Sequence, residues 1–195
     1  MIRLFRPECP KPKELAAGNY KFTDNKKALK LSAHEKCMYC ESKISHIDHA
    51  HVEHIKPKAH GKYPHLEYTW TNLGYSCAIC NGKKHDKYDE NTPYIDPYSD
   101  DPEEHLTFHG WIVFPRNGSE RGELTITDVA LNRVELIEQR KDRIEGLLRA
   151  INACFRTQNQ SLKEAALRSL AQEAASNKEY SLAVKFALRA QEVIA

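Results

Sequence analysis

Hydrophobic residues recur with a helical period over the last third of the chain. From residue 128 onward, apolar residues fall near one helix face at a period of 3.6: Val134, Ile137, Ile144, Leu147, Leu148 and Ile151. Two further helices are predicted over SLKEAALRSLAQEA and EYSLAVKFALRAQEVI, which follow the polar stretches RTQNQ and SNK. Residues 128–195 are therefore predicted to be a helical region. Periodicity does not distinguish helices that complete the core from helices that form a docking surface for a partner.

A strand-like pattern marks the preceding stretch, residues 91–127. The runs GWIVF and ELTIT are rich in β-branched and aromatic residues, and the glycine-containing RNGSERG between them is typical of a hairpin loop. Turn-forming residues dominate NTPYIDPYSDDPEEH, which comes before these runs. We therefore expect a turn-rich segment that carries a small β-hairpin.

The first 35 residues form a basic segment. PECPKPKEL is predicted to be extended or turned, and KKALKLSAHE to be a short helix that leads into residues 36–90, where most cysteines and histidines lie. The opening stretch MIRLFRPECPKPKEL has early prolines and charges and lacks the apolar core of a signal peptide. No stretch is long enough for a transmembrane helix, so we expect a cytoplasmic protein without a membrane partner.

Composition changes this picture only slightly. The chain has 195 residues, of which 41% are hydrophobic, enough for a core. The formal net charge is +2, close to balance. Any binding of nucleic acid must therefore come from local basic patches and not from the charge of the whole chain.

Six cysteines require an explanation other than disulfides, because the cytosol keeps thiols reduced. Four of them form two C-x-x-C pairs, CMYC and CAIC: Cys37, Cys40, Cys77 and Cys80. Two such turns supply the four ligands of a tetrahedral structural Zn²⁺ site. The alternatives are a histidine in place of one cysteine, or a redox motif, which normally occurs once. Cys9 and Cys154 stand alone and are expected to be plain buried or half-buried thiols.

The stretch between and after the cysteine pairs carries the candidate chemistry. It contains VEHIKPK, then WTNLGYS, then the second pair followed by NGKK. In this order the chain resembles the zinc-stapled HNH endonucleases, whose motif reads here as Glu53-His54, Asn72 and Asn81, an H-N-N variant. The resemblance implies an α+β fold with a zinc-bound ββα-metal core, in which a β-hairpin and a helix hold one catalytic divalent ion.

The chemistry of phosphodiester hydrolysis explains these residue types. His54 is suited to be the general base, because its ordinary pKa lies near neutrality. Asn72 can orient the imidazole through a side-chain or backbone carbonyl. The resemblance assigns the catalytic ion to Glu53 and to helix residues Asn81 and His85, which at a spacing of four share one helix face. Oxygen ligands favour Mg²⁺ or Mn²⁺.

Two details of the site remain open at this point. Neighbouring residues on a strand point to opposite sides, so Glu53 and His54 serve one site only if the strand end twists or bulges. The order of preference between Asn81 and His85 as helix ligand rests on the place of Asn81 after the cysteine. The other histidines of the region are expected to be surface or capping residues: His46, His49, His51, His60 and His65.

A cluster of lysines surrounds the motif. These side chains are expected to contact nucleic-acid phosphates, which would add salt-dependent affinity without base readout: Lys56, Lys58, Lys83, Lys84 and Lys87.

A closer resemblance rests on CMYCE, VEHIKPK, WTNLGYSCAICNGKK, YIDPYSDDPEEHLTF and ALNRVELIEQR. These stretches are similar to the HNH nuclease component (PtuB) of Septu-type and retron-associated anti-phage systems. The resemblance implies an ABC- or SMC-like ATPase partner of the PtuA type, docked on the helical region, and a DNA substrate, with RNA as the alternative. The competing hypotheses are an inactive zinc-stapled nucleic-acid-binding or adaptor module and a stand-alone restriction-type nuclease.

Overall fold

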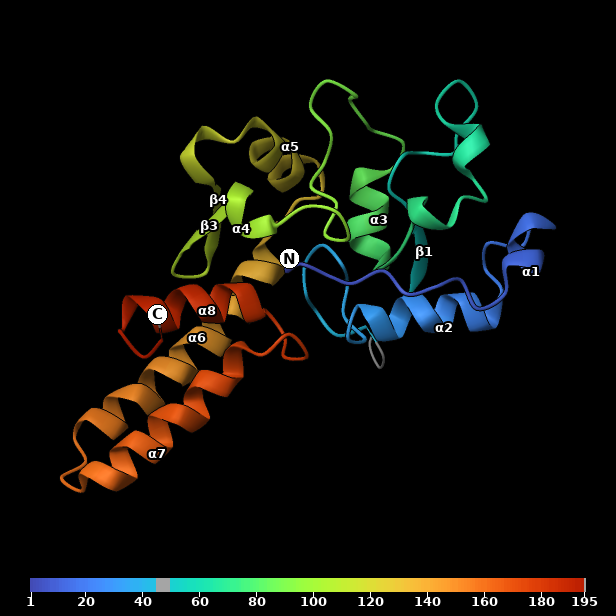
Figure 1. Cartoon of the computed structure of the whole chain (residues 1–195). Coiled ribbons are helices and arrows are strands. Elements are labelled where there is room, and N and C mark those ends of the chain that lie inside the picture. The colour runs from blue at the N-terminus through green and yellow to red at the C-terminus, as the bar shows by residue number, and fades with distance from the viewer. Residues whose placement is uncertain (45–49, 195) are drawn as a thin grey trace.

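The computed structural model describes residues 1–44 and 50–194; His46 and His49 lie outside this part of the chain. The architecture is α+β, as predicted, with two small antiparallel sheets among helices (Figure 1). The strands and longer helices are α1 Pro12–Ala16, α2 Thr23–Ser32, β1 His51–His54, β2 Leu73–Ser76, α3 Ala78–Lys84, α4 Pro102–His105, β3 Leu106–His109, β4 Ile112–Pro115, α5 Glu120–Asp128, α6 Val134–Phe155, α7 Gln160–Ala171 and α8 Ser181–Ala190. Short 3₁₀ helices are η1 Pro64–Leu66, η2 Trp70–Asn72, η3 Arg116–Gly118 and η4 Gln172–Ala174.

A β-hairpin followed by a helix forms the centre of the motif region. β1 and β2 pair in antiparallel register, with Glu53 opposite Gly74 and His54 opposite Leu73. α3 begins directly after β2 and packs against β1, while α2 packs against β2 (Figure 1). Gly74 lets Met38 approach closely, because an added Cβ would lie 2.2 Å from the Met38 sulfur. The hairpin is thus packed against two helices, α2 on β2 and α3 on β1.

The second hairpin differs from the prediction. β3 pairs with β4 across Gly110, so GWIVF supplies one strand and residues 106–109 supply the other. The run ELTIT, predicted to be a strand, lies inside helix α5, and that prediction is wrong. The Ser119 side chain caps this helix by accepting a hydrogen bond from the Gly122 amide. The buried positions Gly122, Thr125 and Val129 have helical spacing, so packing overrides the β propensity of the run.

Gly122 provides a test of this packing. A Cβ at this position would lie 2.4 Å from the backbone oxygen of His105. We expect Gly122→Ala to lower the free energy of unfolding by about 1–3 kcal/mol, as overpacking does. Gly146→Ala in α6 is the matched control, since its nearest neighbour would be the Arg149 side chain at 3.9 Å. The control should be neutral or stabilise by up to about 1 kcal/mol. Chemical denaturation measures both, and equal stabilities for the two variants would contradict this account.

The C-terminal region contains the three predicted helices, and the buried face of α6 differs from the predicted one at its first residue. Val134, expected on that face, is 65% exposed, because it is the first residue of α6 and precedes the buried turn that starts at Leu136. Ile144, Leu147 and Ile151 are buried as predicted. α6 and α7 lie side by side and project from the rest of the molecule (Figure 1).

One continuous core joins the parts of the chain. Buried residues from the N-terminal segment, the cysteine turns, both hairpins and α8 belong to a single cluster. A second cluster joins α6 to α8 through Leu147, Ile151, Val184 and Leu188. Among the described residues, no helix combines the length and the apolar character that crossing a bilayer requires.

Candidate functional site

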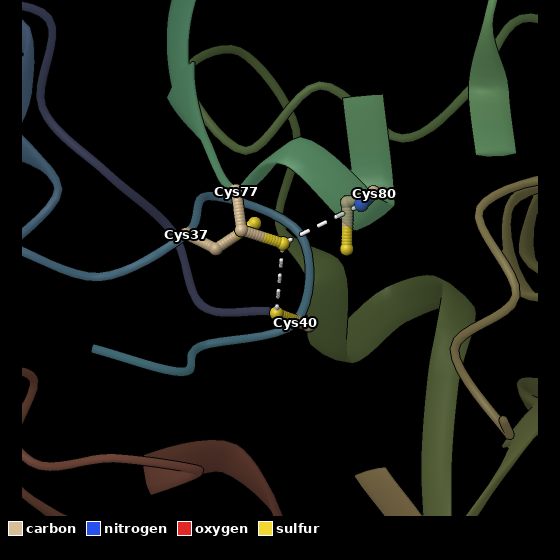
Figure 2. Close-up of side chains that lie close together, drawn as sticks. All are labelled: Cys37, Cys40, Cys77 and Cys80. Carbon is tan, nitrogen blue, oxygen red and sulfur yellow. Dashed lines mark hydrogen bonds between the residues drawn. The ribbon is translucent and has the colours of Figure 1, made fainter. Parts of the chain in front are cut away.

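The four paired cysteines converge, as their spacing predicts. Cys37 and Cys40 lie on a turn closed by the bridge between Lys36 and Lys43, and Cys77 and Cys80 lie at the start of α3 (Figure 2). All four are buried, and their sulfurs lie within 4.8 Å of one another. The Cys40 and Cys77 sulfurs are 3.9 Å apart. Sulfurs around a tetrahedral zinc ion would be about 3.8 Å apart, so the four residues fit a closed structural metal site.

Positive charge lies beside this cluster. Nη1 of Arg133 donates a hydrogen bond to the Cys80 sulfur at 3.6 Å. Burial alone would lower the pKa of Arg133, yet the neighbouring Cys80 and Cys40 side chains raise it above its ordinary value. Because a four-thiolate metal site carries net negative charge, an arginine at the start of α6 stabilises it and ties the helical region to the cysteine turns.

The first cysteine turn is also fastened to the start of α8. The Glu41 carboxylate accepts hydrogen bonds from the Ser181 hydroxyl and, at 3.4 Å, from the Leu182 amide. Lys36 pairs with Glu41 at 3.1 Å and donates to the backbone oxygen of Lys178 at 2.7 Å. The charged side chains of Lys36 and Glu41 are both buried, so these contacts exclude water and fix the turn against α8.

Glu53 projects from β1 toward α3. Its Oε1 accepts from Lys84 Nζ at 2.8 Å and from the Tyr39 hydroxyl at 3.2 Å, while its Oε2 lies against the Asn81 amide. Glu53 and Lys84 are each 1% exposed. Lys84 also donates to the backbone oxygen of His54 at 2.9 Å. Lys84 is therefore a buried partner of Glu53, and its predicted contact with nucleic acid is wrong.

The ion pair has a large expected effect on stability. Lys84→Met keeps most of the side-chain volume and leaves the buried Glu53 carboxylate without its cation. Breaking a buried pair in this way costs about 3–5 kcal/mol, which chemical denaturation would measure with the cysteine cluster metal-loaded and no Mg²⁺ or Mn²⁺ added. Lys83→Met, on the exposed side of the same helix, is the control and should change the stability by about 0.5 kcal/mol or less. A Lys84→Met variant as stable as the control would show that the pair contributes little.

The His54 ring has other partners than the Glu53 carboxylate has. Its Nε2 lies 3.0 Å from the backbone oxygen of Glu67. A carbonyl only accepts, so Nε2 carries the proton and Nδ1 keeps its lone pair in the neutral ring. Burial lowers the pKa of His54, although the Glu67 carbonyl opposes this shift. The imidazole is therefore neutral near pH 7, in the form that accepts a proton.

Asn72 lies beside this strand but does not hold the imidazole. Its Oδ1 accepts from the Lys56 amide at 2.8 Å, and its Nδ2 donates to the oxygens of Lys56 and Leu66 at 3.0 and 3.2 Å. Asn72 thus closes the loop that leads from His54 to Glu67. The predicted direct contact with the ring is absent from the described contacts, and the Glu67 carbonyl takes that place.

A cavity of about 520 Å³ brings the candidate residues together. Glu53 and His54 both line it, because the cavity spans the end of β1 and reaches both sides of the strand; the pairing of β1 with β2 is regular, without a bulge. Asn81 and His85 line it from α3. The remaining lining residues include cations that were not predicted, Lys21 and Lys26, together with Lys58, Tyr20 and His51.

His85 departs from its predicted geometry. α3 ends at Lys84, and His85 follows with a φ of 51°, so it does not share a helix face with Asn81. Its ring is 75% exposed and lies 2.7 Å from an Asp86 carboxylate oxygen. His85 therefore borders the cavity from its rim, whereas Asn81 lies directly beside Glu53.

The other predicted lysines are dispersed. Lys58 lines the cavity, and Lys83 is exposed on α3. Lys56 lies over the rings of Tyr63 and Tyr88, outside the cavity lining. Lys87 pairs with Asp128 at 3.0 Å. His51, His60 and His65 are exposed, as expected of surface residues.

Comparison with known proteins agrees with this geometry. Residues 37–87, which hold both cysteine pairs, the hairpin and α3, match the HNH endonuclease family. This segment is an HNH domain. The chain is also 33% identical to Septu protein PtuB of Bacillus mycoides, over 62% of this chain and 51% of the relative. It is 31% identical to Septu protein PtuB of Bacillus thuringiensis, over 69% and 56% of the two chains.

A third relative belongs to a different system. The HNH protein of retron Vc95 from Vibrio cholerae is 34% identical, over 61% of this chain and 62% of the relative. The chain thus spans roughly half to three fifths of the length of these curated relatives.

Sequence reasoning missed several residues around the HNH domain. Tyr20, Lys21 and Lys26 border the cavity from the N-terminal segment, and the motif gives no signal for them. Tyr39, inside the first cysteine pair, bonds Glu53, yet nothing in the spacing indicates this contact. Only the basic character of residues 1–35 pointed toward the lysines.

Proposed function

We propose that the protein is a metal-dependent endonuclease that hydrolyses phosphodiester bonds of nucleic acids. The observation that carries the proposal is the meeting of Glu53, Asn81 and His54 at one cavity of an HNH domain. The Glu53 carboxylate and the Asn81 amide line the cavity together with the neutral imidazole of His54. This arrangement provides ligands for a hard cation and a base within reach of one bound phosphate.

His54 would act as the general base. Its Nε2 proton is held by the Glu67 carbonyl, so Nδ1 is the nitrogen that takes a proton from the attacking water. Burial keeps the ring neutral before the reaction. Asn72 would act indirectly, because it holds the loop whose Glu67 carbonyl orients the ring.

The residues present fit a divalent ion at one place. Oε1 of Glu53 is occupied by Lys84 and Tyr39, whereas Oε2 faces Asn81. The two amide atoms of asparagine are distinguished only by their hydrogen bonds, and a half-turn of the Asn81 amide sets Oδ1 beside Oε2. Mg²⁺ or Mn²⁺ held by these two oxygens would supply charge neutralisation at the phosphate and the departing oxygen. His85 is the second candidate ligand from the rim.

Substrate contacts are proposed for the cavity lysines. Lys58, Lys21 and Lys26 border the cavity, and Lys83 lies exposed on α3. Lysines of this kind bind phosphates without reading bases, so binding should weaken with salt and show little sequence preference. The cysteine cluster would hold Zn²⁺ as a structural ion, since thiolates favour it and the site leaves no open position.

The biological setting is proposed from the relatives. Two are named Septu protein PtuB and a third is a retron protein. We propose that this chain is an effector of an anti-phage defence system and works with an ABC- or SMC-like ATPase of the PtuA type. The projecting pair α6–α7 offers surface for such a partner, with Phe155 and Leu162 46% and 59% exposed.

One experiment tests the proposal and the substrate together. The purified protein, with and without the product of its genomic neighbour, is incubated with plasmid DNA and with total RNA in Mg²⁺, Mn²⁺ or EDTA. Cleavage of either substrate that requires the divalent ion supports the proposal, and the degraded substrate gives its class. Binding without hydrolysis under every condition favours an adaptor. Sequence-dependent cutting by the chain alone favours a stand-alone restriction-type nuclease.

A further inference from the structure

Tyr20 lies against the ring of His54, although it comes from the segment before the HNH domain. The centroids of the two rings are 4.7 Å apart and their planes meet at 73°, an edge-to-face contact. Tyr20 precedes α2 and lines the same cavity as His54. The imidazole is thus bordered by an aromatic ring that lies outside the family match at residues 37–87.

Lys58 connects Tyr20 to Glu67, whose backbone oxygen also holds the His54 imidazole. Lys58 Nζ donates to the Tyr20 hydroxyl at 3.0 Å and pairs with the Glu67 carboxylate. The backbone oxygen of the same Glu67 bonds Nε2 of His54. The hydrogen bond and the ring contact are therefore linked through Lys58, and both hold the imidazole.

We propose that Tyr20 is a positioning residue that, together with the Glu67 carbonyl, fixes the orientation and tautomer of the His54 imidazole. The expected effect of Tyr20 on the cleavage rate rests on the proposed function, whereas its effect on the orientation of the imidazole does not. A single hydrogen bond at Nε2 restrains rotation of the ring about its Cβ–Cγ bond but does not fix it. The contact with the Tyr20 ring restricts this rotation and so helps to hold the ring orientation that the Glu67 carbonyl selects.

The proposal also gives Lys58 a second role. Its ammonium lies 4.3 Å from the centre of the Tyr20 ring and bridges Tyr20 to Glu67. Lys58 was predicted only as a phosphate contact. In this arrangement Lys58 also positions Tyr20 and Glu67, the two residues that position the His54 imidazole.

Kinetics of the full, metal-loaded chain, with its partner if cleavage needs one, provide the first test. Tyr20→Ala is expected to lower kcat by about 10- to 100-fold while KM changes little, because a misplaced base slows the chemical step. Tyr20→Phe keeps the edge contact and should recover most of the lost rate. Phe114→Ala, an aromatic truncation on the exposed side of β4, is the matched control and should leave kcat unchanged. A raised KM with unchanged kcat would overturn the proposal, since Tyr20 would then contact the substrate.

Nuclear magnetic resonance provides a test that does not depend on activity. In ¹⁵N-histidine protein near pH 8, the wild type should show the Nε2–H tautomer of His54, assigned by the loss of its signals in His54→Ala. Tyr20→Ala should shift and broaden these signals, and Tyr20→Phe should restore them. Tyr20→Leu, which fills the space without an aromatic edge, replaces Tyr20→Ala if the alanine variant unfolds. Unchanged His54 signals in a folded variant overturn the proposal. A wild type that cuts neither DNA nor RNA contradicts the nuclease function and leaves this readout intact.

Discussion

His54→Ala is expected to lower kcat for nucleic-acid cleavage by about 10²–10⁴-fold, the range that a general base contributes. The physical reason is the loss of the imidazole that lines the cavity and whose Nε2 is held by the Glu67 carbonyl. KM should change little, because Lys58, Lys21 and Lys26, the proposed phosphate contacts, remain in place. Initial rates of plasmid or RNA cleavage at saturating Mg²⁺ measure the effect.

Two controls make the His54 result specific. His109→Ala removes an exposed histidine from β3 and should cleave at the wild-type rate. The thermal midpoint of His54→Ala should remain near that of the wild type, which separates lost chemistry from lost fold. Undiminished cleavage by folded His54→Ala would exclude the histidine as base.

Loss of the structural metal should have the largest effect on stability. Cys80→Ser removes one of four buried ligands, and the ligand atoms of the other three cannot close a tetrahedral shell. Structural zinc contributes about 10–16 kcal/mol of apparent binding free energy, so a large part of the folding free energy is at risk. We expect the variant to lose the zinc ion proposed for this cluster, together with its cooperative unfolding transition. Elemental analysis and calorimetry measure the two effects.

Cys154→Ser is the matched control for the metal. Cys154 is half-buried on α6 and lies outside the cluster of four sulfurs. This variant should retain one zinc ion per chain and a wild-type transition. Full zinc content in Cys80→Ser would show that the remaining three cysteines recruit another ligand, in line with the alternative of a histidine in one position.

Spacing along the chain predicts contacts that are local or belong to a motif. The two C-x-x-C turns meet because each pair is preorganised by its own turn, and the Cys77 cap of α3 follows from the same spacing. The place of Asn81 beside Glu53 is what the resemblance to the HNH endonucleases implies. Strand alternation predicts the opposite directions of Glu53 and His54. For these residues the local backbone decides the geometry.

Contacts between distant segments were not predictable in the same way. ELTIT has the alternation of a strand, yet the Ser119 cap and the tight fit of Gly122 against His105 favour a helix. Lys84 appears as one surface lysine among several, and only packing shows that it is buried against Glu53. Tyr20 belongs to no recognisable sequence motif. Its contact with His54 depends on how α2 packs against the hairpin.

The contacts of Glu41 determine what can be removed from this molecule. Because Ser181 and Leu182 complete the surroundings of a carboxylate next to Cys40, and Arg133 lies against Cys80, both halves of the metal cluster are supported from beyond residue 127. The HNH domain is therefore not a transferable cassette. A fragment limited to residues 37–87 would leave Glu41 without these partners, and grafts or truncations need to carry α8 and the beginning of α6 with the nuclease centre.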